Sequence, residues 1–288
     1  MGIKSLKQTS ERTVPSVIDI KYEEIRNEMN ELKSVIAGRH CAILLPGKSI
    51  KRLETDIKKY ADKDICWTSM GVFNVLEKGI LSKIDKQLSI VLDCATVPTA
   101  RFPHYEKYAR KPRLEPYLAR KKRNLLLTTN GMIRDAIKPH YPENFLDKYG
   151  HKIVIIDDIF PGEDRAKWMD VPNSATLLIA ALFAGEARSI VIFGMDGYKG
   201  DISIGYESYY KPGHVVKERF HAMGTVEDPG INRDTGYFEE RFPHLLLDYR
   251  NLFDTAIPIF NCSPNSIYSC PQKITYEDLE VFYGATKH

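Results

Sequence analysis

Short apolar runs recur along the chain, separated by stretches whose apolar positions have a helical spacing. Each run is apolar throughout instead of alternating with polar residues, which is typical of strands covered on both faces of a parallel sheet. The runs are 41–45, 64–69, 88–93, 124–129, 152–157, 189–195 and 257–261. Helices are expected over 50–60, 71–80, 131–138, 173–185, 239–254 and 276–283. This alternation predicts an α/β protein with a single, doubly wound parallel sheet.

The same pattern suggests one main domain. Residues 41–288 carry the strand and helix alternation, and residues 1–40 form an N-terminal extension with an amphipathic helix over 21–37. Two segments interrupt the alternation, 97–123 and 197–238; the first is basic and rich in proline, and the second is rich in glycine and tyrosine. Long irregular insertions in a compact α/β domain are usually lids or binding loops, so we expect both to act as lids.

Composition narrows the class of protein. The chain has 288 residues, 43% of them hydrophobic and 27% charged, which is ordinary for a soluble globular protein. The formal net charge of +3 gives little support for a nucleic-acid partner. No apolar run approaches the roughly 20 residues of a membrane-spanning helix, and the N-terminus lacks the apolar core of a signal peptide. We therefore expect a cytoplasmic location, with association at the inner face of the membrane and homo-oligomer formation left open.

The cysteines give no sign of a metal site or a disulfide framework. Their number is odd and none of them forms a C-x-x-C pair, which indicates buried, reduced thiols. They are Cys41, Cys66, Cys94, Cys262 and Cys270.

Ligands in open α/β sheets bind outside the carboxyl ends of the strands, so the residues directly after each apolar run are the candidates for a site. These positions are polar and small: 47–49, Ser69, Asp93, Asn173 and Ser174, Asp196 with Tyr198, and 261–265. Free N–H groups at the helix starts after Gly47 and Asn173 would favour an anionic ligand such as a nucleotide phosphate.

Each of these positions also has a simpler interpretation. Pro46 and Gly47 are equally consistent with a plain turn, Asn173 or Ser174 with a helix N-cap, and Asp93 with a solvated strand end. An ATP-binding P-loop is excluded, because the position that must be glycine is Ala42.

Several other chemistries are excluded by the sequence. It has no G-x-S-x-G, H-E-x-x-H or complete G-x-G-x-x-G motif, no paired Cys and His metal spacing, and no D-x-D at a strand end. The basic run 107–123 is interleaved with Tyr108 and Tyr117 and follows Tyr105, so a nucleic-acid surface is an alternative there. A solvated face is the preferred interpretation, given the small net charge.

Three segments together resemble a known family. They are "PGKSI" at Pro46–Ile50, the long segment Pro172–Tyr198, and "FNCSPNSI" at Phe260–Ile267. Their order along the chain resembles that of the bacterial lipooligosaccharide sialyltransferases, which use CMP-sialic acid, and of the related family that includes the 6-hydroxymethylpterin diphosphokinases. The resemblance covers roughly residues 41–94 and 172–270 and implies a Rossmann-like, GT-A-variant fold.

The resemblance also implies roles for individual residues. Tyr198 and Tyr206 would donate hydrogen bonds to the departing phosphate. The family's general-base histidine has no counterpart in register, where this chain reads "GINRDTGY" (230–237), so we expect His221 as the base, His214 as the second candidate and Asp234 as an alternative. The residues implied in binding the nucleotide and the donor sugar are Gly47, Lys48, Ser49, Ser69, Asp93, Asn173, Ser174, Asp196, Ser263, Asn265 and Ser266.

The expected activity is therefore that of a glycosyltransferase. It would move sialic acid or a related nonulosonic acid from a CMP-activated donor to a glycan or lipid-linked acceptor by direct displacement, with no essential metal ion. One alternative is an ATP-dependent, 6-hydroxymethylpterin diphosphokinase-like enzyme, with Mg²⁺ held by acidic residues such as Asp93 and Asp196. Another is a non-catalytic nucleotide-binding protein, which the missing histidine favours.

Overall fold

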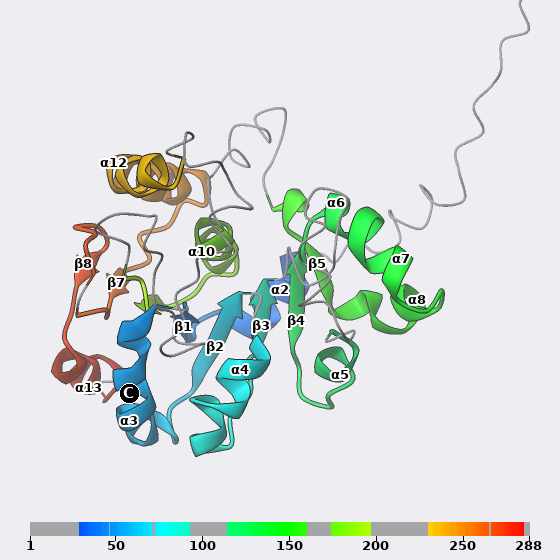
Figure 1. Ribbon diagram of the computed structural model, residues 1–288, viewed down its shortest axis with the longest axis horizontal. Helices are drawn as coiled ribbons and strands as arrows, with labels where there is room; N and C mark the ends of the chain where they lie inside the picture. The colour runs from blue at the N-terminus through cyan, green and yellow to red at the C-terminus, as the bar shows by residue number, and fades with distance from the viewer. Residues whose placement is uncertain are drawn as a thin grey trace, which may run out of the picture.

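The computed structural model describes residues 29–45, 47–70, 73–92, 114–159, 174–196, 230–264 and 266–284. Its centre is one eight-stranded sheet with the order β5-β4-β3-β2-β1-β6-β7-β8 (Figure 1). All neighbouring strands are parallel. The strands are β1 His40–Leu44, β2 Ile65–Met70, β3 Ile90–Leu92, β4 Leu125–Thr128, β5 Ile153–Ile155, β6 Ser189–Phe193, β7 Ile259–Asn261 and β8 Gln272–Lys273. The expected α/β fold with a single Rossmann-like parallel sheet is confirmed.

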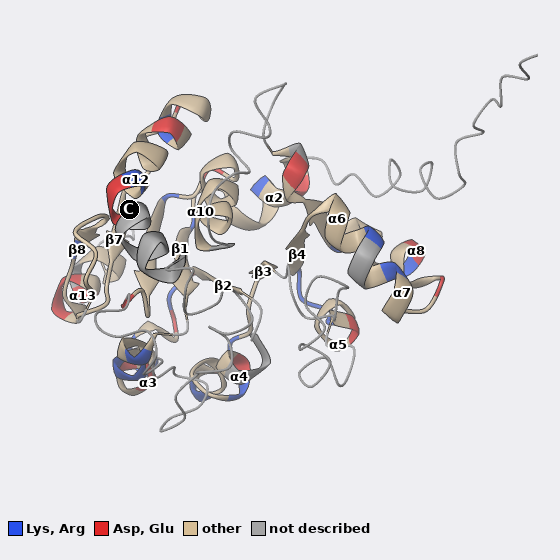
Figure 2. Ribbon diagram, turned by 45° about the horizontal axis from the view of Figure 1, so that its top comes forward, with Lys and Arg blue, Asp and Glu red and all other residues tan. Residues whose placement is uncertain are grey.

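The strands form because they bury apolar side chains on both faces. None of β1 to β7 contains a Lys, Arg, Asp or Glu residue, and in Figure 2 the charged residues colour helices and connections. Along β1, Ala42 and Leu44 belong to the core on one face of the sheet, and Cys41 and Ile43 to the core on the other. Burial of each side chain of leucine size stabilises the fold by about 1.5–3 kcal/mol. A charged side chain at such a position would lose its hydration without a partner, so it is strongly disfavoured.

Helices cover both faces of the sheet, with α10 and α12 on one side and α3, α4 and α5 on the other (Figure 1). The helices of the α10 side are α2 Met29–Ile36, α10 Ser174–Ala184 and α12 Gly230–Leu252. Those of the α3 side are α3 Lys51–Asp56, α4 Phe73–Lys78, α5 Leu114–Leu118, α6 Asn130–Met132, α8 Phe145–Tyr149 and α13 Tyr276–Gly284. The short helix α7 Lys138–His140 has no buried residue. A π-helical turn at Ile133–Ile137 joins α6 to α7, and short 3-10 turns are found at Lys48–Ile50, Ile57–Tyr60, Leu81–Ile84, Gly150–Lys152 and Ile156–Asp158. Within the described residues, none of these helices is long and apolar enough to span a membrane.

The two segments expected to be lids are partly ordinary elements of the fold. Residues 114–118 of the first segment form α5, whose Leu114, Tyr117 and Leu118 are buried in the core. The Tyr117 hydroxyl donates to the backbone oxygen of Leu125 at 2.9 Å, so this tyrosine does not belong to a solvated or nucleic-acid-binding face. Residues 230–238 of the second segment begin α12. The remainder of both segments lies outside the described residues.

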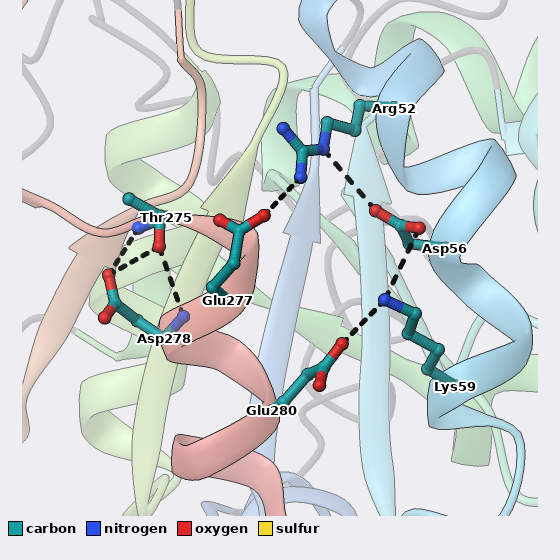
Figure 3. Close-up of polar contacts among 7 residues, drawn as sticks. All are labelled: Arg52, Asp56, Lys59, Thr275, Glu277, Asp278 and Glu280. Carbon is teal, nitrogen blue, oxygen red and sulfur yellow. Dashed lines mark hydrogen bonds and ion pairs between the residues drawn. The ribbon is translucent and has the colours of Figure 1, made fainter.

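The C-terminal helix α13 is fixed against α3 (Figure 3). Thr275 caps α13, because its hydroxyl accepts the N–H of Asp278 at 3.2 Å while the Asp278 carboxylate accepts the N–H of Thr275 at 2.7 Å. Ion pairs then join α13 to α3 and to the 3-10 turn that follows α3, Arg52 with Glu277 and Lys59 with Glu280, each at 2.6 Å. These pairs are exposed and are worth at most about 1 kcal/mol each. The buried side chains of Tyr276, Leu279 and Tyr283 therefore supply most of the attachment.

The cysteine expectation is confirmed for three thiols. Cys41, Cys66 and Cys262 are buried and free, whereas Cys270 is half-buried and free. Cys94 lies outside the described residues.

Candidate functional site

The order of the strands reverses between β1 and β6, and there the two loops that follow these strands are held together. The N–H of Leu45 donates to the backbone oxygen of Phe193 at 2.9 Å, and the N–H of Gly47 donates to that of Gly194 at 3.0 Å. A Cβ atom on Gly47 would lie 2.2 Å from the Gly194 oxygen and 2.7 Å from a carboxylate oxygen of Asp196. Only glycine permits this close approach, so Gly47 is fixed by the contact between the loops.

Asp196 occupies the start of the helix that follows β1. Its Oδ2 accepts the N–H of Ser49 at 2.8 Å, and its backbone oxygen accepts the N–H of Ile267 at 2.9 Å. A carboxylate is stabilised there by the positive end of the helix dipole. The expectation of free N–H groups after Gly47 is therefore wrong for Gly47 and Ser49, because the protein's own carbonyl and carboxylate groups accept both.

Two polar atoms at this point have no hydrogen-bond partner among the described residues. They are Oδ1 of Asp196 and Oγ of Ser49, and both atoms are buried. Because the N–H of Ser49 contacts the other oxygen of the same carboxylate, the two atoms belong to one small cluster. A buried carboxylate oxygen without a donor is unfavourable by itself, which makes this cluster a candidate for contact with a ligand.

The loop after β7 lies next to the same point. The Ser263 hydroxyl accepts the N–H of Met195 at 2.8 Å, and the Asn261 side-chain amide donates to the Ser266 hydroxyl at 2.9 Å. The ammonium group of Lys273 donates to the Ser266 backbone oxygen at 2.7 Å. Ser263 therefore contacts the loop after β6, and Ser266 contacts Asn261 at the end of β7, so each of these hydroxyls already has a protein partner. Oδ1 of Asn261 is buried and has no partner among the described residues.

Three other candidates lie on strand β2, at the start of α10 and on the turn after β1. Ser69 is fully buried, and its hydroxyl donates to the backbone oxygen of Leu44 at 3.0 Å, which ties β2 to β1. Ser174 is the first residue of α10, but its side chain lies outside the described residues. Lys48 is exposed on the turn between Gly47 and Ser49.

The remaining candidates cannot be positioned from the described residues. Asp234 is part of α12, but its side chain is not described. The others lie outside the described residues altogether: Asp93, Asn173, Tyr198, Tyr206, His214, His221 and Asn265.

Cys262, between Asn261 and Ser263, is the thiol closest in sequence to the switch point. Burial raises its pKa to about 12, so it is neutral at physiological pH and is not an activated nucleophile. Within the described part of the chain, no group of three or more His, Cys, Asp or Glu side chains is arranged to hold a metal ion.

A second aspartate has the same structural role as Asp196, and the sequence had not singled it out. Asp157 follows β5, and its Oδ2 accepts the N–H of Asn130 at 2.7 Å, at the start of the helix that follows the neighbouring strand β4. The sequence signal for both is the same, an aspartate one to three residues after a buried strand.

Comparisons with protein-family models, curated proteins and solved structures found no match to this chain.

Proposed function

We propose that the chain is a glycosyltransferase that moves sialic acid or a related nonulosonic acid from a CMP donor to a glycan acceptor. One observation carries this proposal: loops from three neighbouring strands, β1, β6 and β7, meet at the point where the strand order reverses. Gly47, Ser49 and Asp196 come together there, with Ser263 beside them and Ser266 hydrogen-bonded to Ser263. Open α/β sheets bind nucleotides and related ligands in this position.

The polarity of the cluster determines how a nucleotide would lie. The N–H groups of Gly47 and Ser49 already donate to acceptors of the protein, and Asp196 adds negative charge. The phosphate is therefore disfavoured at this helix start. The start of α10 is the better place for the phosphate. This helix runs back from the carboxyl edge to the beginning of β6, so its N-terminus, at Ser174, lies at the same edge as the cluster. Eleven residues give it a substantial dipole.

The chemical step would use residues outside the described ranges. Tyr198 and Tyr206 would stabilise the negative charge that develops on the departing CMP, and loss of one such donor costs about a hundredfold or more in rate. His221 is the proposed base that accepts the proton of the acceptor hydroxyl, and His214 is the second candidate. In this proposal the fold acts as a GT-A variant, and residues 97–113 close over the donor as a lid.

A panel of nucleotides tests the proposal directly. The thermal unfolding midpoint of the full chain is measured with CMP, CDP, UDP, GDP and ATP, each with and without Mg²⁺. We expect CMP to raise it without metal, and release of CMP from CMP-sialic acid to require His221, with His221→Ala inactive but still able to bind CMP. Preference for ATP with Mg²⁺ would instead favour the diphosphokinase-like activity. Binding of CMP with no turnover of the donor would favour a non-catalytic nucleotide-binding protein.

A further inference from the structure

We propose that Asp196 and Ser49 bind a vicinal diol of the ligand through Oδ1 and Oγ. The proposal rests on the nucleotide-sugar function above and defines which part of the ligand meets the switch point. Two neighbouring hydroxyls occur both in the ribose of a nucleotide and in the side chain of a nonulosonic acid. The ribose is the expected source, and the experiment below separates the two.

The carboxylate is held in one orientation before any ligand arrives. Oδ2 is fixed by the N–H of Ser49, and the backbone of the same aspartate is fixed by the N–H of Ile267. Oδ1 has no donor among the described residues, so it is the carboxylate oxygen with the most capacity to accept a hydrogen bond from a ligand. Because the carboxylate is already ordered, less conformational entropy is lost when a ligand binds.

The two atoms without a partner among the described residues match hydroxyl donors better than any charged group of a nucleotide. Oδ1 accepts only, and Oγ of Ser49 both donates and accepts. A diol supplies one O–H group to the carboxylate and a second hydroxyl that pairs with the serine. A phosphate offers only acceptors to the carboxylate and is repelled by its charge. Loss of one charge-assisted hydrogen bond from a hydroxyl weakens binding by about 10- to 100-fold.

The chain supplies a matched control for the substitution. Asp157 accepts the N–H of Asn130 at 2.7 Å, so it has the same capping contact as Asp196. It follows β5, which lies beside β4 at the edge of the sheet formed by the described residues, away from the switch point. Asp157→Asn should therefore reproduce any effect on folding without an effect on ligand selection.

The experiment compares affinities by isothermal titration calorimetry on the full chain. Dissociation constants for CMP and 2′-deoxy-CMP are measured with the parent, Asp196→Asn, Ser49→Ala and Asp157→Asn. We expect the parent and Asp157→Asn to bind CMP at least about 10-fold more tightly than 2′-deoxy-CMP. Asp196→Asn and Ser49→Ala should reduce this ratio towards one. Ser49→Ala keeps the backbone N–H that donates to Asp196, so it remains informative if Asp196→Asn unfolds.

The other outcomes separate this inference from the proposed function. If CMP and 2′-deoxy-CMP bind equally, free sialic acid is titrated onto the CMP-bound parent and onto CMP-bound Asp196→Asn. Binding to the parent alone would assign the diol to the sugar and support the inference. Equal nucleotide affinities with no dependence of sugar binding on Asp196 would overturn the inference and leave the transferase proposal standing. If no nucleotide binds at all, both are wrong.

Discussion

Replacing Gly47 with alanine tests whether the loops after β1 and β6 are in contact as described. Gly47 has φ −63° and ψ 151°, which alanine adopts without strain. The new Cβ atom alone causes the problem, because it would lie 2.2 Å from the backbone oxygen of Gly194 and 2.7 Å from Oδ2 of Asp196. A backbone oxygen cannot rotate away as a side chain can, so the two loops must separate.

The size of the effect follows from the hydrogen bonds that separation would break. The Gly47 N–H to Gly194 bond is between neutral groups and contributes about 0.5–1.5 kcal/mol, and the Ser49 N–H to Asp196 bond involves a charge and contributes about 1.5–3 kcal/mol. The expected loss in the free energy of unfolding is therefore about 2–4.5 kcal/mol. The same change should weaken nucleotide binding, because Asp196 loses its fixed orientation.

Urea unfolding measures this loss, and Gly131→Ala is the control. Gly131 lies in α6, where an added Cβ atom has its nearest neighbour, Oγ1 of Thr129, at an ordinary 3.8 Å. Alanine in a helix is favoured over glycine by about 0.5–1 kcal/mol, so the control should gain stability. If Gly47→Ala unfolds within about 0.5 kcal/mol of the parent, below the usual loss for a single hydrogen bond, the loops are not in the described contact.

Three further predictions concern stability. Arg120→Met leaves the carboxylate of Glu77, which is only 11% exposed, without its ion-pair partner. Urea unfolding should show that the free energy of unfolding falls by about 3–5 kcal/mol. The control Lys148→Met breaks an exposed ion pair and should lower it by less than about 1 kcal/mol. Thr275→Ala removes the cap of α13 and should cost about 1 kcal/mol by the same assay, and no loss would contradict the capping contact. His40 has a pKa lowered mainly by burial, so the unfolded chain binds a proton more readily than the folded one. Its contribution to stability should be complete above the unfolded pKa of about 6.5 and fall as the pH drops below it. His40→Gln should flatten thermal unfolding midpoints between about pH 7 and 5, and an unchanged slope would exclude this histidine as the cause.

The sequence predicted the sheet well because a strand buried on both faces must be free of charge along its whole length. This signal is present in all of β1 to β7 and absent from β8, whose two residues, Gln272 and Lys273, are exposed. The helix α5 was missed for a different reason. Its buried side chains, Leu114, Tyr117 and Leu118, have helical spacing, but Pro116 and the surrounding basic residues indicated a loop. Pro116 is tolerated because it lies in the first turn, where its missing N–H has no partner to lose.

The candidate site was predictable in position but not in charge. The rule that ligands lie beyond the carboxyl ends of strands led to Gly47, Ser49 and Asp196 from the sequence alone. Their mutual contact was not predictable, because Ser49 and Asp196 are 147 positions apart and meet only through the pairing of β1 with β6. The helix start that looked ready for a phosphate is consequently filled by a carboxylate of the protein.

The two strand-end aspartates show why only one of them is a candidate for contact with a ligand. Asp157 and Asp196 each cap the helix that follows a neighbouring strand, so capping alone does not indicate a ligand. Asp157 follows β5 at the edge of the sheet, whereas Asp196 lies between the loops after β1 and β7 and contacts both, through Ser49 and Ile267. Oδ1 of Asp196 is buried without a donor among the described residues. A ligand hydroxyl can correct that deficit, so we expect the switch point, and not the edge of the sheet, to discriminate between ligands.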